Sequence, residues 1–182
     1  MNEIVNSYTD NQIIERRERI NVMNEYNMTN ALDIDKKYLL KKKMFASCGD
    51  DTEIMSPFFS SWGGKNISIG NNCYINFNVT MIDDGKIEIG NNVLIGPNVT
   101  ISTVNHPLAY EERIKNKIYV KNVIIEDNVW IGANCVILPG VKIEKNSVIG
   151  AGSVVTKNIP SNVLAVGNPC VIKSNNIYWQ SF

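Results

Sequence analysis

The chain has 182 residues, of which 44% are hydrophobic and 20% are charged, and its 18 basic and 18 acidic side chains give a formal net charge of zero. This length and composition suffice for one compact unit with a substantial core and a small appendage, but they leave no room for a second large domain. Without a net positive charge, the sequence predicts no binding to nucleic acid or to an anionic membrane, and local cations would have to meet any bound phosphate.

Targeting signals and cysteine motifs are not found in the sequence. The first ten residues lack the apolar core of a signal peptide, and no segment approaches the roughly 20 apolar residues needed to span a bilayer. We therefore expect a cytoplasmic protein that does not bind membranes. The four cysteines form no CxxC pair, which argues against a zinc or redox motif; they are Cys48, Cys73, Cys135 and Cys170.

Residues 1–58 have helical spacing and are predicted to form an N-terminal helical element. Thr9 and Gln12 read as a capping box that opens a first helix, and a second helix should begin near Asp33 or Asp35 and stop before Gly49. The lysine run at 41–43 is predicted to be a solvated face near the C-terminal end of the second helix. The apolar faces would carry Ile13, Ile20, Met23 and Tyr26 on the first helix, and Leu39, Leu40 and Met44 on the second.

A six-residue repeat fills much of residues 59–172. The repeated apolar positions are Ile69, Ile75, Met81, Ile89, Ile95, Ile101, Ile125, Ile131, Ile137, Ile143, Ile149 and Val155. Smaller residues recur two positions earlier, and because strand side chains alternate, both sets point into one narrow core. The smaller set is Cys73, Val79, Val93, Val99, Val129, Cys135, Val141, Ser147 and Ser153.

The repeat indicates a mainly β solenoid of short strands and tight corners. Three flat faces per turn would make a triangular prism of eighteen-residue coils, stacked at roughly 4.8 Å. One coil cannot bury its own apolar face, so both ends of the stack need covers. Residues 173–182 would form a C-terminal tail.

Two interruptions break the repeat. Met81 and Ile89 are eight positions apart, so Asp83, Asp84 and Gly85 should bulge at a corner. Residues 102–122 leave the register altogether, and a long excursion from a rigid repeat is usually functional or disordered. This loop contains His106, the only histidine in the chain.

His106 is a candidate general base. A base for hydroxyl chemistry should titrate near neutrality on a fixed support, and the following Pro107 stiffens the backbone. A lone histidine is often an ordinary surface or core residue, so the residues alone leave both interpretations open.

Several motifs in this order resemble the hexapeptide-repeat, left-handed parallel β-helix acyltransferases, and most closely the maltose and galactoside O-acetyltransferase group. The resemblance covers nearly the whole chain. The motifs are Glu25-Tyr26-Asn27, Asn76-Phe77-Asn78, Asp83-Asp84, His106-Pro107 with Arg113, Asn128-Val129-Trp130-Ile131-Gly132, Pro139-Gly140-Val141 and VIGAGSVVTK at 148–157.

The resemblance implies transfer of the acetyl group of acetyl-CoA to a hydroxyl of a sugar of the maltose, glucose or galactoside type. It further implies a metal-independent homotrimer with active sites between subunits. By motif position, His106 would be the general base of a direct transfer. Backbone N–H groups would stabilise the oxyanion of the tetrahedral intermediate.

The same resemblance assigns acceptor and coenzyme residues. Asn76 would bind the acceptor, with Tyr74 and Asp84 beside it, although a plain corner role for Asp84 is an equal alternative. Asp10 and Arg16 would supply contacts from the helical element, with Arg17 as an alternative to Arg16. The expected coenzyme A groove is lined by Trp130, Ala133, Ala151, Thr156 and Lys157, and Lys173 could replace an arginine that relatives carry where this chain has Val171.

Three other functions are compatible with a solenoid of this kind or with parts of the sequence. A zinc carbonic anhydrase of the same fold needs three imidazole ligands, which one histidine per chain cannot supply. A non-catalytic sugar-binding scaffold is a further alternative, as is an acetyltransferase acting on an antibiotic or a cell-surface glycan. Trp62 could stack on a sugar or pack under the helices.

Overall fold

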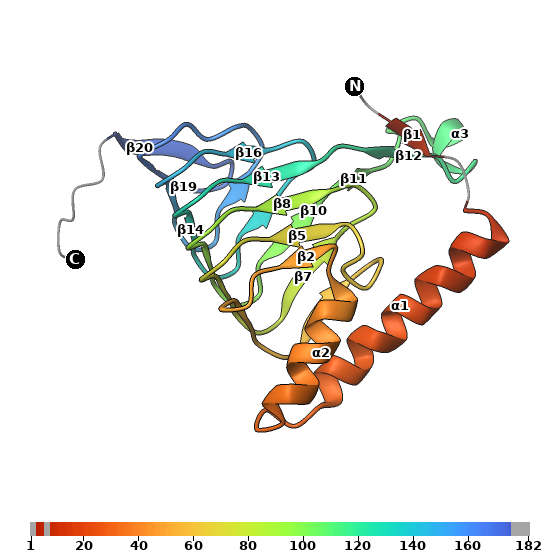
Figure 1. Cartoon of the computed structure of the whole chain (residues 1–182). Coiled ribbons are helices and arrows are strands. Elements are labelled where there is room, and N and C mark those ends of the chain that lie inside the picture. The colour runs from red at the N-terminus through yellow and green to blue at the C-terminus, as the bar shows by residue number, and fades with distance from the viewer. Residues whose placement is uncertain (1–2, 6–7, 176–182) are drawn as a thin grey trace.

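A computed structural model describes residues 3–5 and 8–175. In it the chain winds into a stack of coils whose short parallel strands form three flat faces (Figure 1). Two helices cover the N-terminal end of the stack, and a loop with strands of its own projects from one corner. The predicted mainly β, parallel-strand solenoid with an N-terminal helical element is confirmed.

Each face is one sheet with its strands in coil order. Face I contains β4 (Phe58–Ser60), β7 (Val79–Ile82), β10 (Thr100–Ser102), β15 (Val136–Ile137) and β18 (Val154–Val155). Face II contains β2 (Ser47–Cys48), β5 (Ile67–Ile69), β8 (Ile87–Ile89), β13 (Val123–Ile125) and β16 (Lys142–Ile143). Face III contains β3 (Glu53–Ile54), β6 (Tyr74–Ile75), β9 (Leu94–Ile95), β14 (Trp130–Ile131), β17 (Val148–Ile149), β19 (Val163–Val166) and β20 (Val171–Asn175).

The predicted inward positions form the core. All twelve members of the larger set are buried, and so are all nine of the smaller set, including the hydroxyl-bearing Ser147 and Ser153. Ser147 Oγ donates to the Pro160 carbonyl at 2.7 Å, and Ser153 Oγ donates to the Gly150 carbonyl at 2.5 Å. Because each buried hydroxyl has a partner, the core accepts small polar residues in the narrow rows without an unpaired group.

The three corners differ in their residues. Between faces II and III lies the asparagine corner, where one asparagine in each of the five coils after the first has φ between 55° and 62°. Asparagine tolerates this left-handed region better than other residues with a Cβ, which allows a tight corner. The amides form a ladder, each Nδ2 donating to the next Oδ1 at 2.8–3.0 Å. The ladder runs through Asn72, Asn92, Asn128, Asn146 and Asn162.

The small-residue corner lies between faces III and I. A Cβ added at Gly96 would lie 2.7 Å from the Ala133 nitrogen, and one at Gly132 would lie 2.6 Å from the Ala151 nitrogen. Successive coils therefore touch backbone to backbone here, and glycine is required for the approach. The third corner, between faces I and II, carries the interruptions of the repeat and is called the loop corner below.

The N-terminal helices are α1 (Asp10–Met28) and α2 (Ile34–Met44). Thr9 and Gln12 form the predicted capping box of α1, and Asp33 caps α2. Of the residues expected to face the core, Ile13 and Leu39 are exposed, Leu39 to 60%, because the hairpin covers only the end of a narrow prism. The other five are buried or partly buried: Ile20, Met23, Tyr26, Leu40 and Met44.

Helix α1 is joined to the first coil by the Tyr26-Asn27 motif. Tyr26 OH donates to the Ile54 carbonyl at 2.5 Å. The Asn27 amide donates to the Phe58 carbonyl at 2.8 Å and accepts from the Phe58 N–H at 2.9 Å. These bonds replace the pairing that a preceding coil would give, so α1 acts as a cover for the end of the stack.

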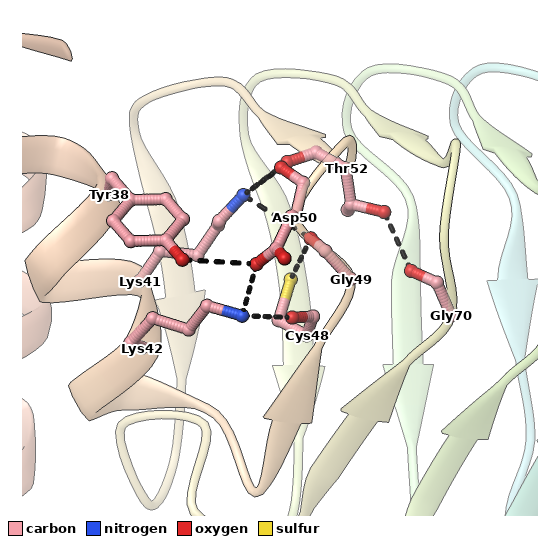
Figure 2. A network of polar contacts seen from close by, with 8 residues as sticks. All are labelled: Tyr38, Lys41, Lys42, Cys48, Gly49, Asp50, Thr52 and Gly70. Atoms are coloured by element: carbon pink, nitrogen blue, oxygen red, sulfur yellow. Dashed lines mark hydrogen bonds and ion pairs between the residues drawn. The ribbon is translucent and has the colours of Figure 1, made fainter. Parts of the chain in front are cut away.

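The predicted solvated lysine face is wrong at Lys41. This side chain is 7% exposed, and its Nζ donates to the carbonyls of Gly49, Asp50 and Thr52 at 3.4, 3.1 and 2.7 Å (Figure 2). The neighbouring Lys42 is exposed and pairs with the Asp50 carboxylate at 2.6 Å. The carbonyls of the first corner have no earlier coil to bind, and the Lys41 ammonium satisfies them.

The coils begin before residue 59. β2 pairs with β5, and β3 pairs with β6, both in parallel, so the first coil starts at Ser47 within the segment predicted as helical. The buried residues Cys48, Ile54 and Ser60 already follow the six-residue spacing. At the other end, β20 turns back and pairs antiparallel with β19, so it occupies the last edge of the face III sheet. The tail beyond Asn175 lies outside the described residues.

The projecting loop has its own secondary structure. It contains β11 (Val104–Asn105), α3 (Tyr110–Arg113) and β12 (Ile118–Val120). β12 pairs antiparallel with β11 on one side and with β1 (Glu3–Val5) on the other (Figure 1). In the described part of the chain, no helix is both long enough and apolar enough to cross a membrane.

Candidate active site

Three successive coils build a polar cluster at the loop corner. The first coil contributes the turn at residues 61–66, the second contributes Asp83 and Asp84, and the third contributes the base of the loop that carries His106. Helix α1 and the preceding Tyr8 lie beside this corner, since Arg16 Nε donates to the Ser61 carbonyl at 2.7 Å and Tyr8 OH donates to Asp84. The two sequence interruptions are therefore neighbours in space.

Asp83 is a fully buried carboxylate that organises the turn at 61–66. Its Oδ1 accepts from Ser60 Oγ at 2.5 Å and from the Trp62 N–H at 2.8 Å. Its Oδ2 accepts from the Asn66 N–H at 3.2 Å. Several donors, two of them fixed backbone groups, can hold a buried carboxylate without a cation, so we interpret Asp83 as structural.

Asp84 is half-buried at the loop corner. Its Oδ1 accepts from Tyr8 OH and from Trp62 Nε1, the latter at 3.2 Å, and its Oδ2 accepts from Ser61 Oγ at 2.9 Å. Burial, together with the hydrogen bond to Asp84, raises the pKa of Tyr8 to about 12, so the phenol stays a proton donor at neutral pH. Asp84 is thus an oriented carboxylate at the surface of the cluster.

Arg16 and Trp62 complete this group. The Arg16 guanidinium lies 5.9 Å from the centre of the Tyr8 ring, and the Tyr8 and Trp62 rings meet edge to face at 5.1 Å. Trp62 is only 5% exposed, which favours the packing role over stacking on a sugar. Arg17 is exposed, and Asp10 is exposed in the first turn of α1, where a carboxylate favours the helix dipole.

The turn that contains Asp84, at the loop corner, contacts the base of the His106 loop. Thr103 is fully buried; its Oγ1 accepts from the Gly85 N–H at 2.9 Å and donates to the Ile82 carbonyl at 2.6 Å. A Cβ at Gly85 would lie 2.5 Å from Val120 Cγ1, at the end of the loop. Both ends of the loop therefore contact the corner that follows β7. One of these contacts, at Thr103, is only three residues from His106.

His106 itself is exposed at the end of β11. Pro107 is buried, and Arg113 Nη1 donates to the Pro107 and Leu108 carbonyls, both at 3.1 Å. Glu111 is exposed, whereas Glu112 pairs with Lys115 and Lys117 at 2.7 and 2.5 Å. The segment after His106 is therefore fixed by backbone-directed contacts, while the ring is presented to the outside.

Tyr74 and Asn76 lie elsewhere on the same chain. Tyr74 is on the outer side of β6 in face III, and Asn76 follows it at the small-residue corner, where its Oδ1 accepts from the Phe77 N–H at 2.8 Å. Face I separates this corner from Asp84 and His106. Because a strand advances about 3.3 Å per residue, the residues of β7 and its flanks hold the two corners roughly 15 Å apart.

The residues expected to bind coenzyme A divide in the same way. Trp130 is 43% exposed on the outer side of face III, in register with Tyr74 and Leu94, and Ala133 and Ala151 stack at the small-residue corner. Thr156 and Lys157 are exposed on the opposite side of face I, at the loop corner. Lys173 is exposed on β20. No single corner of one chain gathers the predicted set.

Three residues of the cluster were not predicted from the sequence: Tyr8, Ser61 and Thr103. Tyr8 is 76 positions from Asp84, and no spacing rule connects a residue before a helix with a corner that far along the chain. In the described residues, no group of three or more His, Cys, Asp and Glu side chains could hold a metal ion.

Comparisons with known proteins bear on this arrangement. Residues 122–157 match the family model described as bacterial transferase hexapeptide (six repeats). The chain is 47% identical over 159 residues to a galactoside O-acetyltransferase of Lactococcus lactis, covering 87% of this chain and 77% of that one. It is 48% identical over 156 residues to a galactoside O-acetyltransferase of Escherichia coli, covering 85% and 76%.

Solved structures give the same picture. A galactoside acetyltransferase in complex with coenzyme A has a TM-score of 0.92 at 42% identity, covering 95% of this chain and 86% of its own. A maltose O-acetyltransferase from Clostridium difficile has a TM-score of 0.93 at 36% identity, covering 97% and 94%. A hexapeptide-repeat acetyltransferase from Vibrio cholerae, complexed with acetyl coenzyme A, has a TM-score of 0.87 at 36% identity, covering 92% and 90%.

Proposed function

Since this chain belongs to the hexapeptide-repeat acetyltransferases, and within them to the galactoside and maltose O-acetyltransferase group, we propose that it transfers the acetyl group of acetyl-CoA directly to a sugar hydroxyl, with His106 as the general base. Its co-substrate is acetyl-CoA. The observation that carries the proposal is the attachment of the His106 loop, through Thr103, to the corner that presents Asp84.

In the proposed reaction the acetyl group passes directly to the acceptor, and no covalent enzyme intermediate forms. Neutral His106 takes the proton of the acceptor hydroxyl while the hydroxyl oxygen attacks the thioester carbonyl. The carbon–oxygen bond forms, the tetrahedral intermediate collapses, and the carbon–sulfur bond breaks. The imidazolium then returns its proton to the departing thiolate, which leaves as coenzyme A. An exposed ring on a loop fixed by Arg113 and Pro107 suits this exchange because both partners must reach it.

For the acceptor, we propose that Asp84 accepts a hydrogen bond from a sugar hydroxyl, near Arg16. Asn76 can donate and accept through its amide, and Tyr74 is its neighbour on face III. Asp10 belongs to the proposed acceptor side on the resemblance alone, because its place on α1 is also explained by the helix dipole.

For coenzyme A, we propose a groove along the small-residue corner. Trp130 offers an exposed ring, and Ala133 and Ala151 leave room beside backbone that already lies close. Thr156 and Lys157 are exposed at the loop corner of the last coils, across face I from this groove, so Lys157 would meet the phosphates where the loop corner of a neighbouring copy adjoins it. Lys173 is exposed on β20 and would supply a second ammonium group.

A homotrimer explains why these residues divide between two corners. If three copies meet around a threefold axis with face I of each turned toward it, the loop corner of one copy faces the small-residue corner of the next. His106 and Asp84 of one subunit would then oppose Asn76 and Trp130 of its neighbour. Within one chain, the same groups are held apart by the width of face I.

The test of the chemistry is thiol release from acetyl-CoA, measured with a panel of mono- and disaccharides. His106→Ala should lower turnover by about two to four powers of ten, as expected for removal of a general base. Asn105→Ala, a change at the adjacent exposed residue, is the control and should keep turnover within about twofold. Equal turnover of His106→Ala and the wild type would contradict the mechanism.

The test of the shared site is complementation between inactive subunits. When His106→Ala and Asn76→Ala chains are co-expressed in equal amounts, mixed trimers each contain one site in which both residues are intact. With random mixing, about a quarter of all sites should be active. A site formed within one chain would show no recovery of activity.

The sugar panel also tests the acceptor. Activity on another hydroxylated compound, with none on any sugar, would keep the mechanism and change only the acceptor.

A further inference from the structure

The hydrogen bonds to Asp84 leave its carboxylate few lone-pair positions for a ligand. A carboxylate oxygen has two lone-pair positions, so the group can accept about four hydrogen bonds. Tyr8 OH and Trp62 Nε1 occupy both positions of Oδ1. Ser61 Oγ, whose single hydrogen is shared between Asp84 Oδ2 at 2.9 Å and Asp83 Oδ1 at 3.1 Å, occupies one position of Oδ2. A single position, on Oδ2, is left for a ligand.

Tyr8 is held firmly in this arrangement although it precedes the first helix. Its ring meets the Trp62 ring edge to face at 5.1 Å, and the Arg16 guanidinium lies 5.9 Å from its centre. The neighbouring Thr9 caps α1, so the backbone after Tyr8 is fixed as well. Since burial raises its pKa to about 12, Tyr8 keeps its proton and donates to Asp84 throughout the physiological pH range.

We propose that Tyr8 is a positioning residue that determines acceptor specificity: by filling Oδ1 of Asp84, it limits that carboxylate to one sugar hydroxyl, read by Oδ2. This inference rests on the proposed function, in which Asp84 contacts the acceptor. Without the phenol, Oδ1 gains an open position, and the carboxylate can accept from two neighbouring hydroxyls or turn between alternative ones. Sugars that differ in one hydroxyl would then be distinguished less well.

The experiment compares Tyr8→Phe with the wild type on a galactoside and the matching glucoside. Phenylalanine keeps the ring contacts with Trp62 and Arg16 and removes only the hydroxyl. The matched control is Tyr26→Phe, which removes a buried phenol hydrogen bond of the same protein, to the Ile54 carbonyl, away from this cluster. KM and kcat for each sugar, and KM for acetyl-CoA, are measured for all three proteins.

For Tyr8→Phe we expect KM for the better sugar to rise about five- to twentyfold, with kcat and KM for acetyl-CoA within about twofold. The ratio of kcat/KM between the two sugars should shrink by at least about threefold, whereas Tyr26→Phe should keep the wild-type ratio. A structural role of Tyr8 would lower activity on both sugars equally. An unchanged ratio in Tyr8→Phe, with or without a uniform loss of activity, overturns the proposal.

A second variant removes the other hydrogen-bond donor to Asp84 Oδ1. Trp62→Phe removes the Nε1 donor to Oδ1 and keeps an aromatic ring beside Tyr8, so it should shift the ratio in the same direction. If Tyr8→Phe does not fold, as judged by circular dichroism and assembly size, this variant decides. A wild-type protein that acetylates neither sugar would contradict the proposed function, and this inference with it, whereas an active wild type with unchanged variants contradicts only the inference.

Discussion

The asparagine corner and the loop corner of the same solenoid differ in how their turns are made. At the asparagine corner, five coils use the same residue, nearly the same φ, and a continuous amide ladder. At the loop corner, the connections are a turn at 61–66, a two-residue insertion at Asp83 and Asp84, a loop at 102–122 and a Pro139-Gly140 turn. The first corner maintains the stacking of the coils, and the second holds the variable polar groups.

This contrast shows how a repeat protein can carry a specific site. Because the amide ladder and the close glycine contacts at two corners set the register, the third corner can change length without disturbing the strands. The loop-corner residues are then stabilised by contacts of their own, chiefly the buried Asp83 and Thr103. The comparison predicts large, local effects at the loop corner and small, distributed effects at the asparagine corner.

The largest effect is expected for Asp83→Ala. Removing this carboxylate leaves the N–H groups of Trp62 and Asn66 without their acceptor in a buried turn. The free energy of unfolding should fall by about 3 kcal/mol, measured by urea denaturation. Asp51→Ala, at an exposed carboxylate, is the control and should change it by less than about 0.5 kcal/mol. A small change at Asp83 would mean that the corner is held by other contacts.

Thr103→Val should affect both stability and turnover. Valine keeps the shape but loses the bonds to the Gly85 N–H and the Ile82 carbonyl, so stability should fall by about 1 to 2 kcal/mol. Because Thr103 fixes the base of the His106 loop, we expect kcat to fall by about tenfold. Thr100→Val, in the preceding strand β10 on the outer side of face I, should leave kcat unchanged. Equal kcat for the two variants would contradict a role of the loop base in positioning His106 for catalysis.

A middle rung of the ladder tests the asparagine corner. Asn128 has φ of 60°, so Asn128→Ala both strains the backbone and removes two ladder bonds, whereas Asn128→Gly removes only the bonds. We expect stability losses of about 1 to 2 kcal/mol for alanine and about 0.5 to 1 kcal/mol for glycine. Turnover should not change in either variant, and a fall in kcat would argue against the division of labour between the corners.

The smallest effect concerns α3 at low pH. Hydrogen bonds from Lys115 and Lys117 lower the pKa of Glu112 to about 2, from an ordinary value of 4.5. A depressed carboxyl pKa gives stability that is present above 4.5 and is lost as the pH falls toward 2. Hydrogen exchange of the amides at 110–118 should therefore show less protection at pH 3 than at pH 6. Glu112→Gln should remove that pH dependence, and its persistence would point to another group.

Much of the fold could be predicted because it repeats. A period of six over many coils identifies inward rows, and every residue assigned to them is buried. The sequence does not predict where the stack begins. Cys48, Ile54 and Ser60 keep the six-residue spacing, but Ser60 is polar and the preceding residues have a helical pattern. The lysine run predicts a surface position for Lys41, because a sequence does not show which carbonyls the end of a stack leaves unpaired.

The site was only partly accessible from sequence. Interruptions of the repeat pointed to Asp84 and to the loop of His106, and the structure brings their bases together through Gly85 and Thr103. The roles of His106, Asp84 and the coenzyme residues stay predictions. Tyr8 could not have been found, because its contact with Asp84 depends on how α1 lies against the coils, which no local pattern encodes.

The amide ladder has a direction. Each side chain gives its hydrogen to the rung that follows in the chain, from Asn72 toward Asn162, so the amide dipoles are aligned. During synthesis, the last finished coil therefore has an asparagine Nδ2–H group free to donate to the asparagine of the next coil that leaves the ribosome. Growth of the stack can proceed vectorially, with each newly made turn recognised by the edge of the one before it.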